Sequence, residues 1–85
     1  SDQPERAVEV ARAVARNRPG DPRAWVALSR FLHRPEYAEE AIEALDEAIK
    51  LNPRHVEAYD LKSERLAELG RFDEAKAAAC PPIFA

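Results

Sequence analysis

Cysteine and glycine are scarce in this 85-residue chain, and methionine is absent. With Cys80 as the only cysteine, no disulfide can form within the chain, and we expect a reducing, cytoplasmic location. Two isolated glycines cannot build the glycine-rich loop that holds a phosphate. Because there is no methionine, we do not expect Ser1 to be the natural start, and we interpret the sequence as a piece of a longer protein.

Long apolar runs are missing as well. The longest uncharged stretch covers residues 77–85, far short of the roughly 20 apolar residues of a membrane span, so we expect no membrane partner. The net charge of -3 argues against nucleic acid as a partner. The spacing of His33, His55 and Cys80 matches no metal-binding pattern, and no orienting group for a Cys–His nucleophile is evident. We therefore predict no metal, no cofactor and no enzymatic activity.

Most of the chain consists of helix-forming residues, with the apolar ones at helical spacing. Hydrophobic residues account for 46% and charged residues for 34%, with alanine, glutamate, arginine and leucine prominent. Asp21-Pro22 suits a helix start, Asn52-Pro53 stops a helix, and Gly70 suits the position after a helix end. No segment shows the sustained alternation of a strand. We predict five helices, at residues 4–17, 22–34, 38–51, about 55–69 and about 73–80.

The side chains recur with a period of 34 residues. Pro19 is followed six residues later by Trp25, and Pro53 is followed six residues later by Tyr59. Several small and apolar residues obey the same offset; these are Ala7, Ala41 and Ala75, then Ala11 with Leu45, Ser29 with Ser63, and Leu32 with Leu66. Such a period is typical of a helical repeat in which helix hairpins stack on one another. We expect Trp25 and Tyr59 to fill the space between neighbouring hairpins, and the alanines to let helices approach closely.

The residues at these spacings resemble the tetratricopeptide repeat family. The central unit carries Trp25, Leu28, Ser29, Ala41, Leu45, Ala48 and Pro53, and the next carries Tyr59, Ser63, Leu66, Gly70, Phe72 and Ala75. The resemblance implies an all-α fold, a short right-handed solenoid of antiparallel helix hairpins with about five helices. It divides the single domain 1–85 into a partial repeat at 4–19, a complete repeat at 22–55, a partial repeat at 56–80 and a tail at 81–85. Lys62 in place of a leucine, and Pro35-Glu36 in place of the turn glycine, depart from the pattern.

In the family, the first helix of each hairpin lines a concave groove that accepts a peptide. The resemblance therefore assigns partner binding to Arg23, Arg30, Arg34, Glu57, Asp60 and Glu64. Residues 1–34 carry a net charge of +3 and residues 35–85 a net charge of -6, so this groove has a basic half and an acidic half. An alternative interpretation is that the two halves bridge adjacent repeats, with Arg23 facing Glu57 and Arg30 facing Glu64.

The predicted function is a protein–protein interaction module that binds a partner peptide or protein in the concave groove. Because a solenoid needs about three repeats for stability, one complete repeat also suggests self-association through the unpaired ends. Ile83 and Phe84 are apolar and have no helix left to cover them, so a homo-oligomer would use them together with the terminal helices. Two further alternatives are a structural spacer and the non-catalytic repeat arm of a larger enzyme.

Overall fold

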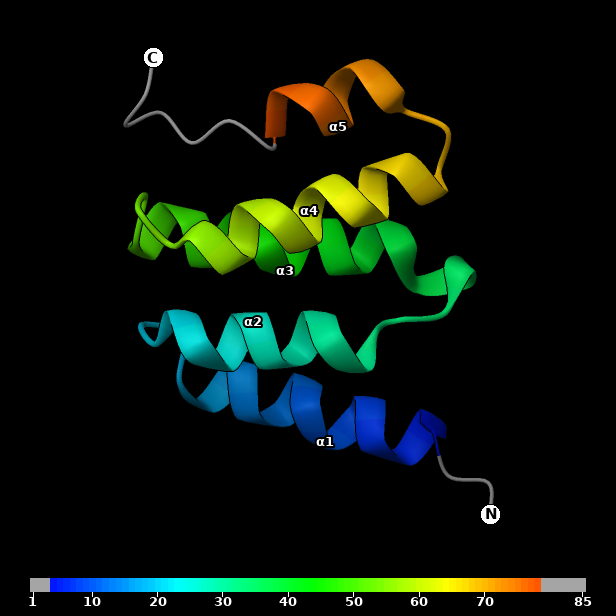
Figure 1. Cartoon of the computed structure of the whole chain (residues 1–85). Helices are drawn as coiled ribbons and strands as arrows, with labels where there is room; N and C mark the ends of the chain where they lie inside the picture. Colours follow the sequence, from blue (N-terminus) through cyan, green and yellow to red (C-terminus); the bar gives the residue numbers. More distant parts are fainter. Residues whose placement is uncertain (1–3, 79–85) are drawn as a thin grey trace.

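The fold is a row of five α-helices, seen in a computed structural model that describes residues 4–78 (Figure 1). The helices are α1 (Pro4–Asn17), α2 (Pro22–Phe31), α3 (Ala38–Leu51), α4 (Val56–Glu68) and α5 (Phe72–Ala78), and a single 3-10 turn, η1 (Pro35–Tyr37), precedes α3. No strand occurs within residues 4–78, so the predicted all-α class is confirmed. Cys80, Ile83 and Phe84 lie outside the described residues.

Helix α2 begins where the sequence predicts and ends earlier. The Asp21 carboxylate accepts a hydrogen bond of 2.9 Å from the Arg23 backbone N–H, and Pro22 occupies the first turn. The prediction extended this helix to residue 34, whereas it ends at Phe31. The reason is Pro35, which holds Arg34 in an extended conformation with ψ 148° and starts the 3-10 turn. This turn takes the place of the glycine that the hairpin pattern calls for.

Helix α4 is bounded by a histidine and a glycine. The Nδ1 atom of His55 accepts a hydrogen bond of 3.3 Å from the Ala58 backbone N–H, so the ring caps the helix. At the other end Gly70 adopts a φ of 77°, a left-handed conformation that side chains with a Cβ atom rarely tolerate. The backbone N–H of Arg71 then donates to the carbonyl of Leu66 at 3.0 Å, which closes the helix end and redirects the chain into α5.

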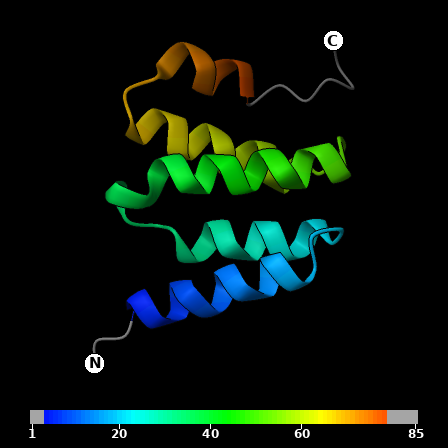
Figure 2. The same cartoon turned by 180° about the vertical axis from the view of Figure 1, so that it is seen from behind.

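Consecutive helices run antiparallel and lie alternately on the two faces of the structure. Figure 1 shows α4 in front of α3, and Figure 2, from behind, shows α3 in front of α4. Within residues 4–78, extensive contacts between helices join those that are consecutive in the chain, as α1 with α2, α2 with α3, α3 with α4, and α4 with α5. A structure in which each hairpin contacts only its neighbours is the defining feature of a helical solenoid.

The core consists of small residues between helices and a few large side chains that are fully buried. Leu32, Leu45 and Leu66 are the largest of these, each no more than 1% exposed. Of the alanines that we expected at close helix approaches, Ala41, Ala48 and Ala75 are buried, whereas Ala7 is only half-buried. Trp25 packs against two core clusters that draw on neighbouring hairpins, as predicted, and Tyr59 is buried, with 8% of its surface exposed.

Lys62 occupies a core-facing position without leaving its charge unpaired. Its ammonium group lies 2.7 Å from the Asp46 carboxylate on α3. The side chain is 27% exposed, so its aliphatic stem covers the helix interface while the charged end reaches the surface. The departure from leucine at this position is therefore compatible with the packing of α4 on α3.

Candidate partner-binding surface

The first helices of two successive hairpins, α2 and α4, share a cavity of about 260 Å³. It is lined by Arg23, Val26, Ala27, Arg30, His55 and Glu57, a set called here the charged groove. Helix α2 contributes the first four residues, spaced along one side of the helix, while the capping residue and first turn of α4 contribute the other two. Three of the six residues that the resemblance assigned to partner binding, Arg23, Arg30 and Glu57, therefore meet at one site.

Arg30 and Glu57 form an ion pair across this groove. The pairing differs from the alternative in the sequence analysis, which placed Arg30 opposite Glu64 and Arg23 opposite Glu57. A 34-residue offset identifies equivalent positions in successive repeats, and equivalent positions are a whole repeat apart rather than in contact. The idea that an arginine bridges adjacent repeats holds for Arg30, whereas the predicted partners were wrong.

Arg23 and the three predicted residues that do not line the groove are exposed. Arg23 pairs with Asp21 at 3.4 Å, at the start of its own helix. Arg34 lies in the turn after α2, 3.4 Å from Glu36. Asp60 and Glu64 lie further along α4, on exposed positions that do not line the charged groove. The structure thus brings half of the predicted set together and leaves Arg34, Asp60 and Glu64 outside the groove lining.

The Asp21 carboxylate lies beside the groove through its contact with Arg23. The hydrogen bond from the Arg23 backbone N–H lowers the pKa of the Asp21 carboxyl below its ordinary value, and the Arg23 side chain adds to this effect. Since Nδ1 of His55 accepts from the helix, its Nε2–H remains a hydrogen-bond donor in the neutral ring. The groove therefore combines guanidinium and imidazole donors with a carboxylate acceptor, a set suited to binding polar peptide groups.

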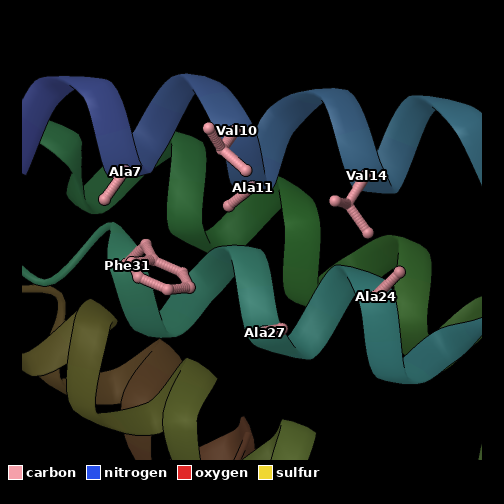
Figure 3. A pocket seen from close by; sticks show the side chains of 7 residues that line it. All are labelled: Ala7, Val10, Ala11, Val14, Ala24, Ala27 and Phe31. Carbon is pink, nitrogen blue, oxygen red and sulfur yellow. The ribbon is translucent and has the colours of Figure 1, made fainter.

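Two other hollows adjoin α2. One, of about 290 Å³, is lined by Trp25, Leu28, Glu40, Glu43, Ala44 and Glu47 and is acidic. The second, of about 310 Å³, lies between α1 and α2 and is lined by Ala7, Val10, Ala11, Val14, Ala24, Ala27 and Phe31, a set called here the apolar groove (Figure 3). Sequence reasoning missed the apolar groove, although the helical spacing of Val10 and Val14, together with Phe31, could have indicated it.

No group of histidine, cysteine and acidic side chains that would hold a metal ion occurs within the described part of the chain. Over residues 4–78, the helices are also too short or too polar to cross a membrane.

Stacked helix hairpins with a charged groove between their first helices define a helical-repeat protein. The family model for the tetratricopeptide repeat matches residues 22–64, just over half of the chain, and the chain belongs to this family. No curated protein and no solved structure matches the chain. Repeats of this type are in general protein–protein interaction modules without catalytic activity of their own.

Proposed function

We propose that the chain binds a segment of a partner protein in the charged groove between α2 and α4. The observation that carries this proposal is the convergence of Arg23, Arg30, His55 and Glu57 on one cavity from two successive hairpins. Val26 and Ala27 give the groove an apolar floor, and the surrounding charges offer orientation-dependent contacts. A peptide with acidic groups near the two arginines and a basic group near Glu57 fits this distribution.

The ion pair between Arg30 and Glu57 is part of the proposed binding mechanism. Arg30 is 60% exposed and Glu57 is 44% exposed at the side chain, so neither is committed to the core. Such a pair contributes little to stability, and a partner can exchange it for its own charged groups at small energetic cost. Arg34, Asp60 and Glu64 do not line the groove, and they would extend the contacts along a longer peptide. We further propose that α2 and α3 form the complete repeat, residues 22–55, between partial repeats at 4–19 and 56–80.

A charge swap tests this function without removing the ion pair. We suggest selecting peptides from a displayed random library on the wild-type chain and measuring their affinity for the double variant Arg30→Glu/Glu57→Arg. The swapped pair can still form, so circular dichroism should show an unchanged fold. Selected peptides should bind the double variant at least about tenfold more weakly, a loss of about 1.4 kcal/mol.

A matched control exists on α3, where Lys50 and Glu47 form an exposed pair at 3.4 Å, away from the groove. The swap Glu47→Lys/Lys50→Glu should leave peptide affinity within about twofold of the wild type. Equal binding of the selected peptides to the groove swap, or failure to select any peptide that binds the wild type, would contradict the proposed function.

A further inference from the structure

The apolar groove between α1 and α2 is an exposed surface that is lined by aliphatic and aromatic side chains. In Figure 3 the side chains of Ala7, Val10 and Val14 project from α1 toward α2, and Phe31 and Ala24 project from α2 toward α1. Val10 is 59% exposed, Val14 is 42% exposed and Phe31 is 47% exposed. Three large apolar residues that share one hollow at such exposure indicate a surface that another element covers.

The chain itself shows what covers the equivalent surface one repeat later. A shift of 34 residues converts the α1 positions of the apolar groove into residues of α3, and these are buried; they are Ala41, Ala44, Leu45 and Ala48. In the same way Ala24 of α2 becomes Ala58 of α4, which is also buried. The cover is helix α2, whose Val26 packs in one cluster with Leu45, Ala48 and Ala58. A helix is therefore the element that fits this surface.

At the opposite end of the row, two described positions of α4 and α5 carry charge where the interior carries apolar residues. Val26 and Ile42 are buried in the middle of the chain, where they receive the next helices. Their equivalents after 34 residues are Asp60 and Lys76, which are charged and exposed. At these two positions the described part of α4 and α5 is charged where the interior is apolar, so these positions do not complement the apolar groove of a second copy.

Charge beside the apolar groove indicates the chemistry of its occupant. Residues 4–34, which include α1 and α2, contain seven arginines and three acidic residues, Glu5, Glu9 and Asp21. Ala27 lines both the apolar groove and the charged groove, so Arg23 and Arg30 lie directly beside the apolar surface. A two-fold dimer through this face would bring like charges together, whereas a helix with acidic flanks would meet opposite charges.

We propose that the apolar groove is the docking site for an amphipathic helix of a partner protein, one with an apolar stripe and acidic residues beside it. The helix lies on α1 and α2 in the manner in which α2 lies on α3 and α4. This surface is distinct from the charged groove, although the two meet at Ala27. A partner with a helical and an extended portion can therefore engage both.

The probe for this proposal is a synthetic peptide of residues 19–36 of this chain with Arg23, Arg30 and Arg34 replaced by glutamate. It keeps the apolar side with which α2 covers the equivalent surface and adds the acidic flank. The fluorescein-labelled peptide should bind the wild-type chain saturably in an anisotropy titration. The unmodified, basic peptide should bind at least about fivefold more weakly at low salt, and the difference should shrink at high salt.

Variants of the groove identify the binding surface. The double variant Val10→Asp/Val14→Asp should bind the acidic peptide at least about tenfold more weakly, because both substitutions put a charge into the apolar contact. Both residues are exposed, so the fold should persist in circular dichroism. The matched control is Val56→Asp, at a residue that is 57% exposed and lies outside both grooves, and it should not change affinity.

Three results would overturn the proposal. The first is the absence of saturable binding, and the second is equal binding by the Val10→Asp/Val14→Asp variant. The third is a wild-type dimer in sedimentation that this variant dissociates, since it would identify a second copy as the occupant. Binding in the charged groove is measured with the library-selected peptides and the Arg30→Glu/Glu57→Arg variant, whereas binding in the apolar groove is measured with the peptide of residues 19–36. Failure of one proposal can therefore be distinguished from failure of the other.

Discussion

Arg12 on α1 and Glu40 on α3 form a bidentate ion pair that spans α2. Nε of Arg12 donates to Oε2 of Glu40 and Nη2 donates to Oε1, both at 2.6 Å. The guanidinium group also lies 5.9 Å from the centroid of the Tyr37 ring. The hydrogen bonds to Glu40 raise the pKa of Arg12 above its ordinary value. Helix α1 is thus tied to the second helix of the next hairpin as well as to its neighbour α2.

We expect a measurable but modest coupling between these two residues. Their side chains are 33% and 35% exposed, so solvent reduces the interaction, while the two-point geometry favours it. A double-mutant cycle with Arg12→Ala and Glu40→Ala, followed by urea denaturation, should give about 0.5–1 kcal/mol at low salt and less in 1 M NaCl. The more exposed pair Lys50–Glu47 should give a coupling near zero. A coupling at Arg12–Glu40 no larger than at this control would show that the pair does not connect the hairpins.

The hydroxyl of Tyr59 should contribute to stability through its contact with the preceding turn. It donates a hydrogen bond of 2.8 Å to the carbonyl of Pro53, at the same six-residue separation as the bond of 3.1 Å from Trp25 Nε1 to Pro19. Tyr59→Phe leaves that carbonyl without its side-chain donor and should lower the free energy of unfolding by about 1 kcal/mol. The urea midpoint should fall with an unchanged m-value. An unchanged midpoint would mean that the bond adds nothing beyond the packing of the ring.

Truncation of Leu45 should remove most of the stability of the chain. Its side chain is fully buried in the cluster with Val26, Ala48 and Ala58, where it leaves a cavity when shortened. Leu45→Ala should lower the free energy of unfolding by about 2–5 kcal/mol, a large share of the total for a domain of this size. Leu51→Ala, at a leucine that is 43% exposed, should cost less than about 1 kcal/mol and serves as the control. Similar effects for both leucines in thermal unfolding would contradict the packing described above.

Acid should weaken the start of α2 through Asp21. Because its pKa is lower in the folded chain than in the unfolded chain, the unfolded chain binds more protons, and stability falls as the pH drops below about 4. Asp21→Asn keeps a side-chain acceptor for the Arg23 backbone N–H but no longer titrates. The thermal midpoint of this variant should therefore change less than that of the wild type between pH 5 and about pH 2.5. Parallel pH profiles for the two proteins would refute this role for the carboxylate.

Helix positions could be predicted well from the sequence because they depend on residues close to one another in the chain. Residues 4–17 and 38–51 match α1 and α3 in full, and Gly70 follows the end of α4 as predicted. The early end of α2 could also have been predicted, because Pro35 restricts the backbone conformation of Arg34. The repeat pattern instead favoured a helix that continues to residue 34. Local rules of this kind act within a few residues, and a single sequence displays them directly.

Relations between helices were harder to predict. The partner of Arg30 is Glu57 rather than Glu64, because side-chain pairing depends on how two helices lie against each other and not on the repeat offset. The apolar groove was missed for a related reason. The apolar stripe of α1 faces two directions, and only the packed structure shows that Ala11 and Ala15 are covered while Val10 and Val14 are not.

The most direct test of the proposed function is to map the residues of the chain that a bound peptide contacts. A peptide selected as proposed above can be titrated into ¹⁵N-labelled protein and followed by two-dimensional amide NMR. The account predicts the largest shift changes at Arg23, Arg30 and Glu57, the residues of α2 and α4 that line the charged groove. Changes confined to the outer side of α3, at Glu43 and Lys50, with those three amides unmoved, would contradict it.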